Sequence, residues 1–243
     1  AIVLGAGASE LIDRVLGVVL RPGERLVAHT PSWPLFPRLC AARMLDAITV
    51  PYRLANDRVD HDLDAVLAAV DGTVRLVYLI SPANPVGCAL DAAPFARFLA
   101  ALPPHVTVVV DEAYGEFVVR PDAVRAPAVT RTDPRVIAIR TFSKFHALAG
   151  LRLGYAVAAP GLSRALAAAA LPFGVTAAAA YAAIAAIGDR DHARRTLAAI
   201  ERGRALCPTA LPSDAPFALA PVPGVPRYFA GRYAMVPLWP NET

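Results

Sequence analysis

Apolar residues near the start of the chain recur with the spacing of one helical face. Between Ser9 and Leu20 they stand three and four residues apart, at Leu11, Ile12, Val15, Leu16 and Val19. This spacing predicts an amphipathic helix over 9–20, because a turn of 3.6 residues brings such positions to one side. Ser9 is expected to cap the helix, and the sequence RPGE at 21–24 to end it.

Further along, short and continuously apolar runs alternate with helical patterns at 63–70 and 95–102. The runs are rich in branched aliphatic residues and predict strands at 25–30, 47–52, 74–81, 106–112, 135–141 and 153–159. Strands that are apolar on both faces, with helices between them, are typical of a parallel sheet covered on both sides. The pattern therefore predicts an α/β fold with a mostly parallel sheet.

The stretch 165–188 carries no charge and is long enough to cross a bilayer. Most of it is alanine, which contributes little transfer free energy, and the sequence LPFG at 171–174 places a proline and a glycine in its middle. We therefore expect two packed, buried helices here and no membrane span.

The chain changes in character after Leu206. From Cys207 onward it is dense in proline and no longer alternates strands with helices. We expect a large domain over 1–206 and part of a small C-terminal α+β domain over 207–243. Because the chain starts inside an apolar run, without a methionine or a signal peptide, it is expected to be a piece of a longer protein.

Composition limits the classes of protein that fit this pattern. With 56% hydrophobic and 18% charged residues, a disordered chain is excluded. The net charge of +4 comes from scattered arginines, so no nucleic-acid surface is predicted. Cys40, Cys88 and Cys207 lie far apart without metal-ligand spacing, which indicates free thiols, no metal site and a cytoplasmic protein.

Two polar residues at predicted strand ends suggest chemistry, since ligands of open parallel sheets bind beyond the carboxyl ends of the strands. Asn84 lies between two prolines in SPANPVG, where the alternative is an ordinary turn asparagine. Asp111 follows three valines, where a carboxylate needs a cation or strong donors.

A third strand end carries Lys144. Alone it would be a surface charge, but a lysine in a semi-buried site has a lowered amine pKa and forms Schiff bases with carbonyls. Ser143 and Arg152 add a hydroxyl and a guanidinium that suit a phosphate. The sequence LGAGASE at 4–10 offers backbone N–H groups at a helix start, although Glu10 replaces the third glycine of the dinucleotide fingerprint.

Together these groups match pyridoxal phosphate (PLP), with an amine for its aldehyde, a carboxylate for its ring nitrogen and donors for its phosphate. The motifs GASE, SPANPVG, DEAYGEF and RTFSKFHALAGLRLGY, in this order, resemble the fold-type I PLP-dependent aminotransferases of class I/II. The histidinol-phosphate aminotransferase branch is the most similar, from about Leu4 to Ala220. The resemblance implies the PLP-transferase large domain with helices on both faces of its sheet.

The resemblance also implies roles for single residues. Lys144 would hold the cofactor and move the substrate proton, Asp111 would keep the ring nitrogen protonated, and Tyr114 would act with them. Asn84 and Tyr114 would bind the ring oxygen, while Trp33 would stack on the ring unless it is a core tryptophan. The phosphate ligands would be the backbone N–H groups of Ala8 and Ser9 with the side chains of Ser143 and Arg152.

An amino acid and a 2-oxo acid as substrates, and a homodimer, are further implications of the resemblance. Family members extend past both ends of this chain, and neither Arg227 nor Arg232 is assigned the role of binding the substrate carboxylate. Turnover by this chain stays open for that reason. The alternatives are a PLP-dependent decarboxylase or lyase of the same fold, a catalytically incomplete PLP-binding protein, and a nucleotide-binding α/β domain.

Overall fold

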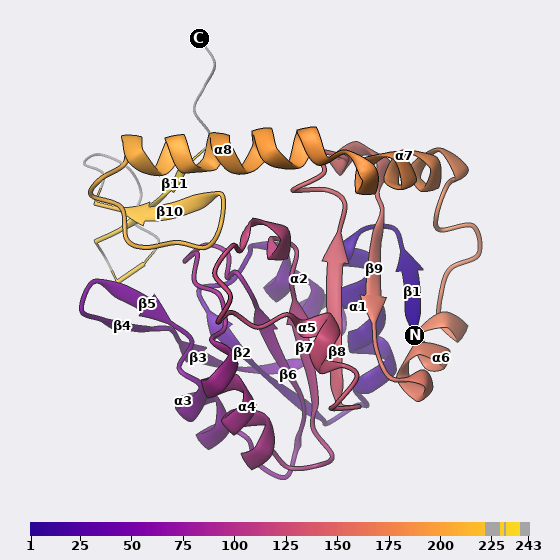
Figure 1. The fold of residues 1–243 in the computed structure, drawn as a ribbon. Helices are drawn as coiled ribbons and strands as arrows, with labels where there is room; N and C mark the ends of the chain where they lie inside the picture. The colour runs from indigo at the N-terminus through magenta and orange to yellow at the C-terminus, as the bar shows by residue number, and fades with distance from the viewer. Residues whose placement is uncertain (222–228, 231, 239–243) are drawn as a thin grey trace.

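The computed structural model describes residues 1–221, 229–230 and 232–238 of the 243-residue chain. Figure 1 shows a sheet with helices packed around it. The strands are β1 Ile2–Gly5, β2 Arg25–Thr30, β3 Asp46–Pro51, β4 Arg53–Ala55, β5 Arg58–Asp60, β6 Val74–Ile80, β7 Thr107–Asp111, β8 Val136–Thr141, β9 Gly154–Val157, β10 Phe217–Ala220 and β11 Ala234–Pro237. The helices are α1 Ala8–Val19, α2 Leu35–Ala42, α3 Leu63–Ala68, α4 Ala92–Ala101, α5 Ala126–Val129, α6 Pro160–Ala168, α7 Ala177–Gly188 and α8 Arg190–Leu206.

The main sheet has the strand order β1-β9-β8-β7-β6-β2-β3. Neighbouring strands from β3 to β8 pair in parallel, whereas β9 pairs antiparallel with both β8 and β1. The prediction of a mostly parallel α/β sheet is confirmed, and each predicted strand and helical pattern has its counterpart. The edge strand β1 and the short pair β4–β5 are additions that the apolar runs did not predict.

Helices cover both faces of this sheet, as the uninterrupted apolar strands require. On one face α1, α2 and α6 contribute buried residues such as Leu11, Phe36 and Leu166. On the other face α3 and α4 contribute Val66 and Phe95. Burying a side chain of this size stabilises the fold by roughly 1.5–3 kcal/mol. The helices on each face therefore stabilise the fold by removing the apolar side chains of the strands from water. In Figure 1, α4 and α5 lie in front of the sheet and α1 lies behind it.

Two local predictions are wrong. The N-cap of α1 is Gly7, with φ of 88°, and Ser9 is the second helical residue and makes no capping bond. A glycine suits that left-handed conformation because it has no Cβ. The stretch 165–188 does form two helices, but α7 is not buried, since Ile184 and Ile187 are 69% and 68% exposed. Only its small residues, such as Ala183, pack against the body, because a helix made mostly of alanine presents little apolar area.

In the part of the chain that the structure describes, no helix is long and apolar enough to cross a membrane. α8 runs above the carboxyl ends of the strands in Figure 1 and ends at Leu206. The division of the chain into two domains near that residue stays a prediction.

The segment after α8 folds back onto the SPANPVG loop. The backbone N–H of Asp214 donates to the Gly87 carbonyl at 2.9 Å. Its carboxylate accepts from the Ala89 N–H at 3.0 Å and from Arg120 at 3.1 Å. These bonds brace the loop that carries Asn84 against the C-terminal part of the chain.

A buried aromatic cluster lies beside the sheet, formed by His29, Tyr52 and His61. The His29 ring stacks on Tyr52 with centroids 4.4 Å apart, and the His61 ring meets His29 edge-on at 5.1 Å. His29 Nδ1 donates to the Val50 carbonyl at 3.0 Å. Burial lowers the pKa of His29 and lowers that of His61 well below its ordinary value of 6.5. Both rings are therefore neutral in the folded protein near neutral pH.

We predict that this cluster makes stability fall on acidification. Below pH 6.5 the unfolded chain binds a proton at His61 that the folded chain excludes. The free energy of unfolding should therefore drop, by about 1.4 kcal/mol for this residue at roughly pH 5.5. Urea denaturation at several pH values should show a smaller drop for His61→Phe than for the wild type. The substitution of an exposed histidine, His105→Gln, serves as the control. The same pH dependence of the unfolding free energy in His61→Phe and wild type would contradict the prediction.

Candidate active site

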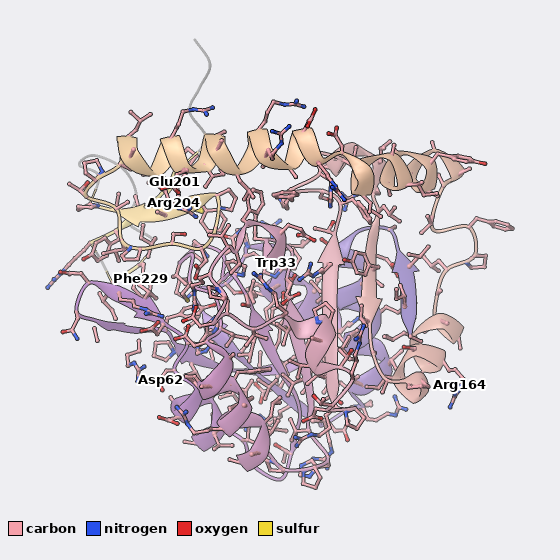
Figure 2. The ribbon with its side chains drawn as sticks, viewed as in Figure 1. Trp33, Asp62, Arg164, Glu201, Arg204 and Phe229 are labelled. Carbon is pink, nitrogen blue, oxygen red and sulfur yellow. The ribbon has the colours of Figure 1, made fainter. Side chains whose placement is uncertain are left out.

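One pocket, with a volume of about 190 Å³, lies at the carboxyl edge of the main sheet. It is lined by all nine residues that the sequence analysis singled out for a cofactor, together with Ile12, Ile80, Ala113, Thr141 and Ala149. In Figure 2, Trp33 marks this region, near the middle of the molecule and below α8. Segments as distant in sequence as the start of α1 and the loop after β8 are thus brought together.

One end of the pocket combines a positive charge with backbone N–H donors. α1 begins at Ala8, and the N–H groups of its first turn, including that of Ser9, have no acceptor within the helix. The Arg152 guanidinium lies beside Gly7, where a Cβ would come within 2.6 Å of Nη2. Arg152 Nη1 donates to Ser143 Oγ at 3.4 Å. Arg152 forms no ion pair with a carboxylate in the described residues, so this end is positively charged.

Close backbone approach explains the second glycine of the sequence GLRLGY, Gly154. A Cβ on Gly154 would lie 2.8 Å from the Arg140 carbonyl oxygen and 2.9 Å from the Ala8 nitrogen. Only glycine lets β9 pass this close to the turn before α1. The same contact fixes the turn before α1 against the strand that follows Arg152.

Asp111 forms the opposite, buried end of the pocket. Its side chain is 3% exposed, Oδ1 accepts from the Ala113 N–H at 3.0 Å, and Oδ2 accepts from the Tyr78 hydroxyl at 2.7 Å. Burial raises the pKa of Asp111 to about 6, although these hydrogen bonds and the charge of Lys144 lower it. The carboxylate therefore has the partners that its position after three valines required.

Between these ends lie Lys144, Tyr114 and Asn84. Asn84 Nδ2 donates to the Tyr114 hydroxyl at 3.3 Å, and Lys144 Nζ lies 5.5 Å from the centroid of the Tyr114 ring. Lys144 is the only lysine in the chain. The expectation of a semi-buried lysine is wrong for this structure, in which Lys144 is exposed, because it stands in the open loop after β8 at the pocket edge.

A buried ion pair holds the DEAYGEF segment in place. Glu112 is 1% exposed, pairs with Arg140 at 2.7 Å and accepts from the Ala126 N–H at 2.8 Å. Arg140 also contacts Glu116 at 3.3 Å. This pair anchors the residues on either side of Tyr114 and leaves Asp111 facing the pocket.

Sequence reasoning missed Tyr78 and Thr141. Tyr78 is the one aromatic residue in a strand that is buried and aliphatic apart from Arg75, and its hydroxyl needs a hydrogen-bond partner there. Of the two arginines left unassigned, Arg227 lies outside the described residues, and Arg232 is exposed. Within the described part of the chain, no group of three or more His, Cys, Asp or Glu side chains could hold a metal ion.

Comparison with known families decides what kind of protein carries this pocket. The family described as aminotransferase class I and II matches residues 1–213. The chain belongs to this family. The resemblance inferred from its four motifs is therefore confirmed, and so is the fold it implied.

The curated relatives of this chain have two kinds of name. The aromatic amino acid aminotransferase of Mycobacterium sp. (strain KMS) is 36% identical over 222 residues, which cover 90% of this chain and 60% of that protein. The histidinol-phosphate aminotransferase of Akkermansia muciniphila is 37% identical over 196 residues, which cover 80% and 52%. The chain thus spans about half to three fifths of the length of these relatives.

A solved structure agrees with the architecture. Histidinol-phosphate aminotransferase from Sinorhizobium meliloti, determined in complex with pyridoxal-5'-phosphate, superposes with a TM-score of 0.81 at 34% identity. The match covers 90% of this chain and 60% of that one.

We predict an unusual pH dependence from Asp111. Its folded pKa of about 6 lies above its ordinary value of 3.8, so the stability it contributes is present at low pH and is lost as the pH rises through 6. Relative to Asp111→Asn, the wild type without ligands should lose about 2.5 kcal/mol of unfolding free energy between pH 4 and 8. Urea denaturation measures this difference. The exposed Asp57→Asn serves as the control, and a difference that grows with pH would contradict the prediction.

Proposed function

We propose that this aminotransferase chain binds pyridoxal phosphate in the pocket and transfers an amino group between an amino acid and a 2-oxo acid. The observation that carries the proposal is the convergence of the only lysine, a buried carboxylate and a cationic helix start on one cavity. Each of these groups has an ordinary explanation alone. Together they offer partners for the aldehyde, the ring nitrogen and the phosphate of this cofactor.

The donor set of the pocket fits the phosphate and the ring. The backbone N–H groups of Ala8 and Ser9, with Ser143 and Arg152, would bind the phosphate dianion, which compensates the unpaired guanidinium. At the other end the Asp111 carboxylate would accept a hydrogen bond from the ring nitrogen. Its two oxygens still have acceptor capacity after the bonds from Tyr78 and Ala113.

The remaining proposed contacts are with the face of the cofactor ring and with its oxygen substituent. Trp33 would lie against the ring face, and Asn84 and Tyr114, which already contact each other, would bind the ring oxygen. When bound, the cofactor supplies an electron sink for the bonds at the substrate Cα. Asp111 would hold a proton on the ring nitrogen, and Lys144 Nζ would hold the cofactor and then carry the proton to and from Cα.

Other properties of the whole protein also belong to this proposal. The relatives' names favour an aromatic or histidinol-phosphate-like amino donor. We propose a homodimer because family resemblance implies one, and a cytoplasmic location because Cys40, Cys88 and Cys207 are free. The large domain would be 1–206, with a partial small domain after it.

Reductive trapping tests the cofactor site. After incubation with PLP and borohydride, the wild type should carry one pyridoxyl group per chain, on the peptide that contains Lys144, and Lys144→Arg should carry none there. The double variant Lys144→Arg/Arg164→Lys moves the only lysine to an exposed position on α6, at the edge of the molecule in Figure 2. It should remain unlabelled at both positions. Equal labelling of the double variant and the wild type would instead indicate nonspecific reaction with any lysine.

A half-reaction tests the chemistry. The PLP-loaded protein, given L-phenylalanine or histidinol phosphate alone, should form at most one equivalent of the oxo product and of pyridoxamine phosphate per site. Liquid chromatography with mass detection measures both, and the PLP-loaded Lys144→Arg protein is the control. Release of carbon dioxide without pyridoxamine phosphate would favour the decarboxylase alternative. PLP binding without either product would favour the catalytically incomplete alternative.

A further inference from the structure

Tyr78 lies on β6, two residues before the strand ends, and its side chain is 1% exposed. Its ring stacks on Phe36 of α2, with centroids 4.1 Å apart and an interplanar angle of 10°. Its hydroxyl lies 2.9 Å from Trp33 Nε1 and 2.7 Å from Asp111 Oδ2. Tyr78 therefore connects Trp33 and Asp111, two residues that line the pocket, without lining the pocket itself.

These two hydrogen bonds have only one direction. The indole N–H of Trp33 can donate but the indole cannot accept, so it must donate to the Tyr78 oxygen. The phenol has a single hydrogen, which is then directed to Asp111 Oδ2. That oxygen has to accept, and an ionised carboxylate accepts more strongly than a neutral acid.

The other groups near Asp111 do not impose this direction. Lys144, from the loop after β8, contributes a positive charge, and Glu112, the next residue, contributes a negative one. Neither forms a hydrogen bond with the Asp111 side chain in the described part of the chain. The Ala113 N–H binds Oδ1, so among the described residues Tyr78 alone donates a hydrogen bond to Oδ2.

We propose that Tyr78, held by the Trp33 indole, is a positioning residue that fixes the orientation of Asp111 and keeps it an acceptor for the cofactor ring. This inference deepens the proposed function and rests on it, because an acceptor carboxylate matters most if a protonated ring nitrogen binds there. It also links the aromatic residue proposed for the ring face to the carboxylate proposed for the ring edge.

Tyr78→Phe tests the inference, since it removes the hydroxyl and keeps the ring that stacks on Phe36. In the protein without cofactor, labelled with carboxyl-¹³C aspartate, the Asp111 signal is the one absent from Asp111→Asn. In the wild type this carboxyl should titrate with a pKa of about 6. In Tyr78→Phe its pKa should be higher by roughly one unit or more, because a hydrogen bond to a charged group is lost.

Tyr52→Phe is a matched control. Tyr52 is also a buried tyrosine of the same core, but its hydroxyl has no hydrogen-bond partner among the described residues. This variant should leave the Asp111 titration unchanged. If Tyr78→Phe does not fold, Trp33→Phe replaces it, and loss of the indole donor should shift the Asp111 titration in the same direction.

Equilibrium dialysis with PLP supplies a second measurement. Tyr78→Phe should bind PLP roughly tenfold or more weakly than the wild type, and Tyr52→Phe should match the wild type. An Asp111 titration in Tyr78→Phe equal to that of the wild type would overturn the inference. A wild type that binds no PLP would count against the proposed function alone, because the titration involves no cofactor.

Discussion

The carboxylate of Asp111 constrains the rest of the pocket. It ends a strand of consecutive valines and is almost fully buried, where an ionised group is unstable without strong partners. The fold supplies a backbone N–H from Ala113, a phenol from Tyr78 and the nearby charge of Lys144. Even so, its pKa remains raised, so the site without ligand keeps an unmet preference for a further positive donor. A protonated ring nitrogen would meet that preference, which is why the fold and the proposed cofactor agree.

The sheet brings these partners together because its central strands run in the same direction. β6, β7 and β8 end at one edge and deliver the SPANPVG loop, Asp111 and the loop with Lys144 side by side. Because β9 is antiparallel to β8, it begins at this edge, which places the preceding Arg152 next to the glycine turn before α1. Two close approaches, at Gly7 and Gly154, bring a backbone turn, a strand and the Arg152 guanidinium together at this end of the pocket. Charge at one end and burial at the other would orient the proposed cofactor along the pocket.

Much of this arrangement could be predicted from sequence because it follows from chain-local signals. The ends of the strands can be located from the polar residues that follow each apolar run. Because parallel strands end at the same edge, this was enough to predict that Asn84, Asp111 and Lys144 lie together. The partner of Asp111 could not be predicted in this way, since it depends on which strand lies beside β7 and on which residue of that strand shares its face. The predictions that Ser9 caps α1 and that α7 is buried were wrong for a related reason. Backbone conformation and the packing of alanine-rich helices are decided by neighbours distant in sequence.

The protonation state of the ring nitrogen provides the most direct test that the pocket is organised around the Asp111 carboxylate. It can be measured by ¹⁵N NMR on the protein loaded with PLP labelled at that nitrogen, near pH 8. The structure predicts the chemical shift of a protonated pyridine nitrogen in the wild type and that of a neutral one in Asp111→Asn. A neutral nitrogen in both proteins, or a protonated one in both, would contradict the role given to this carboxylate.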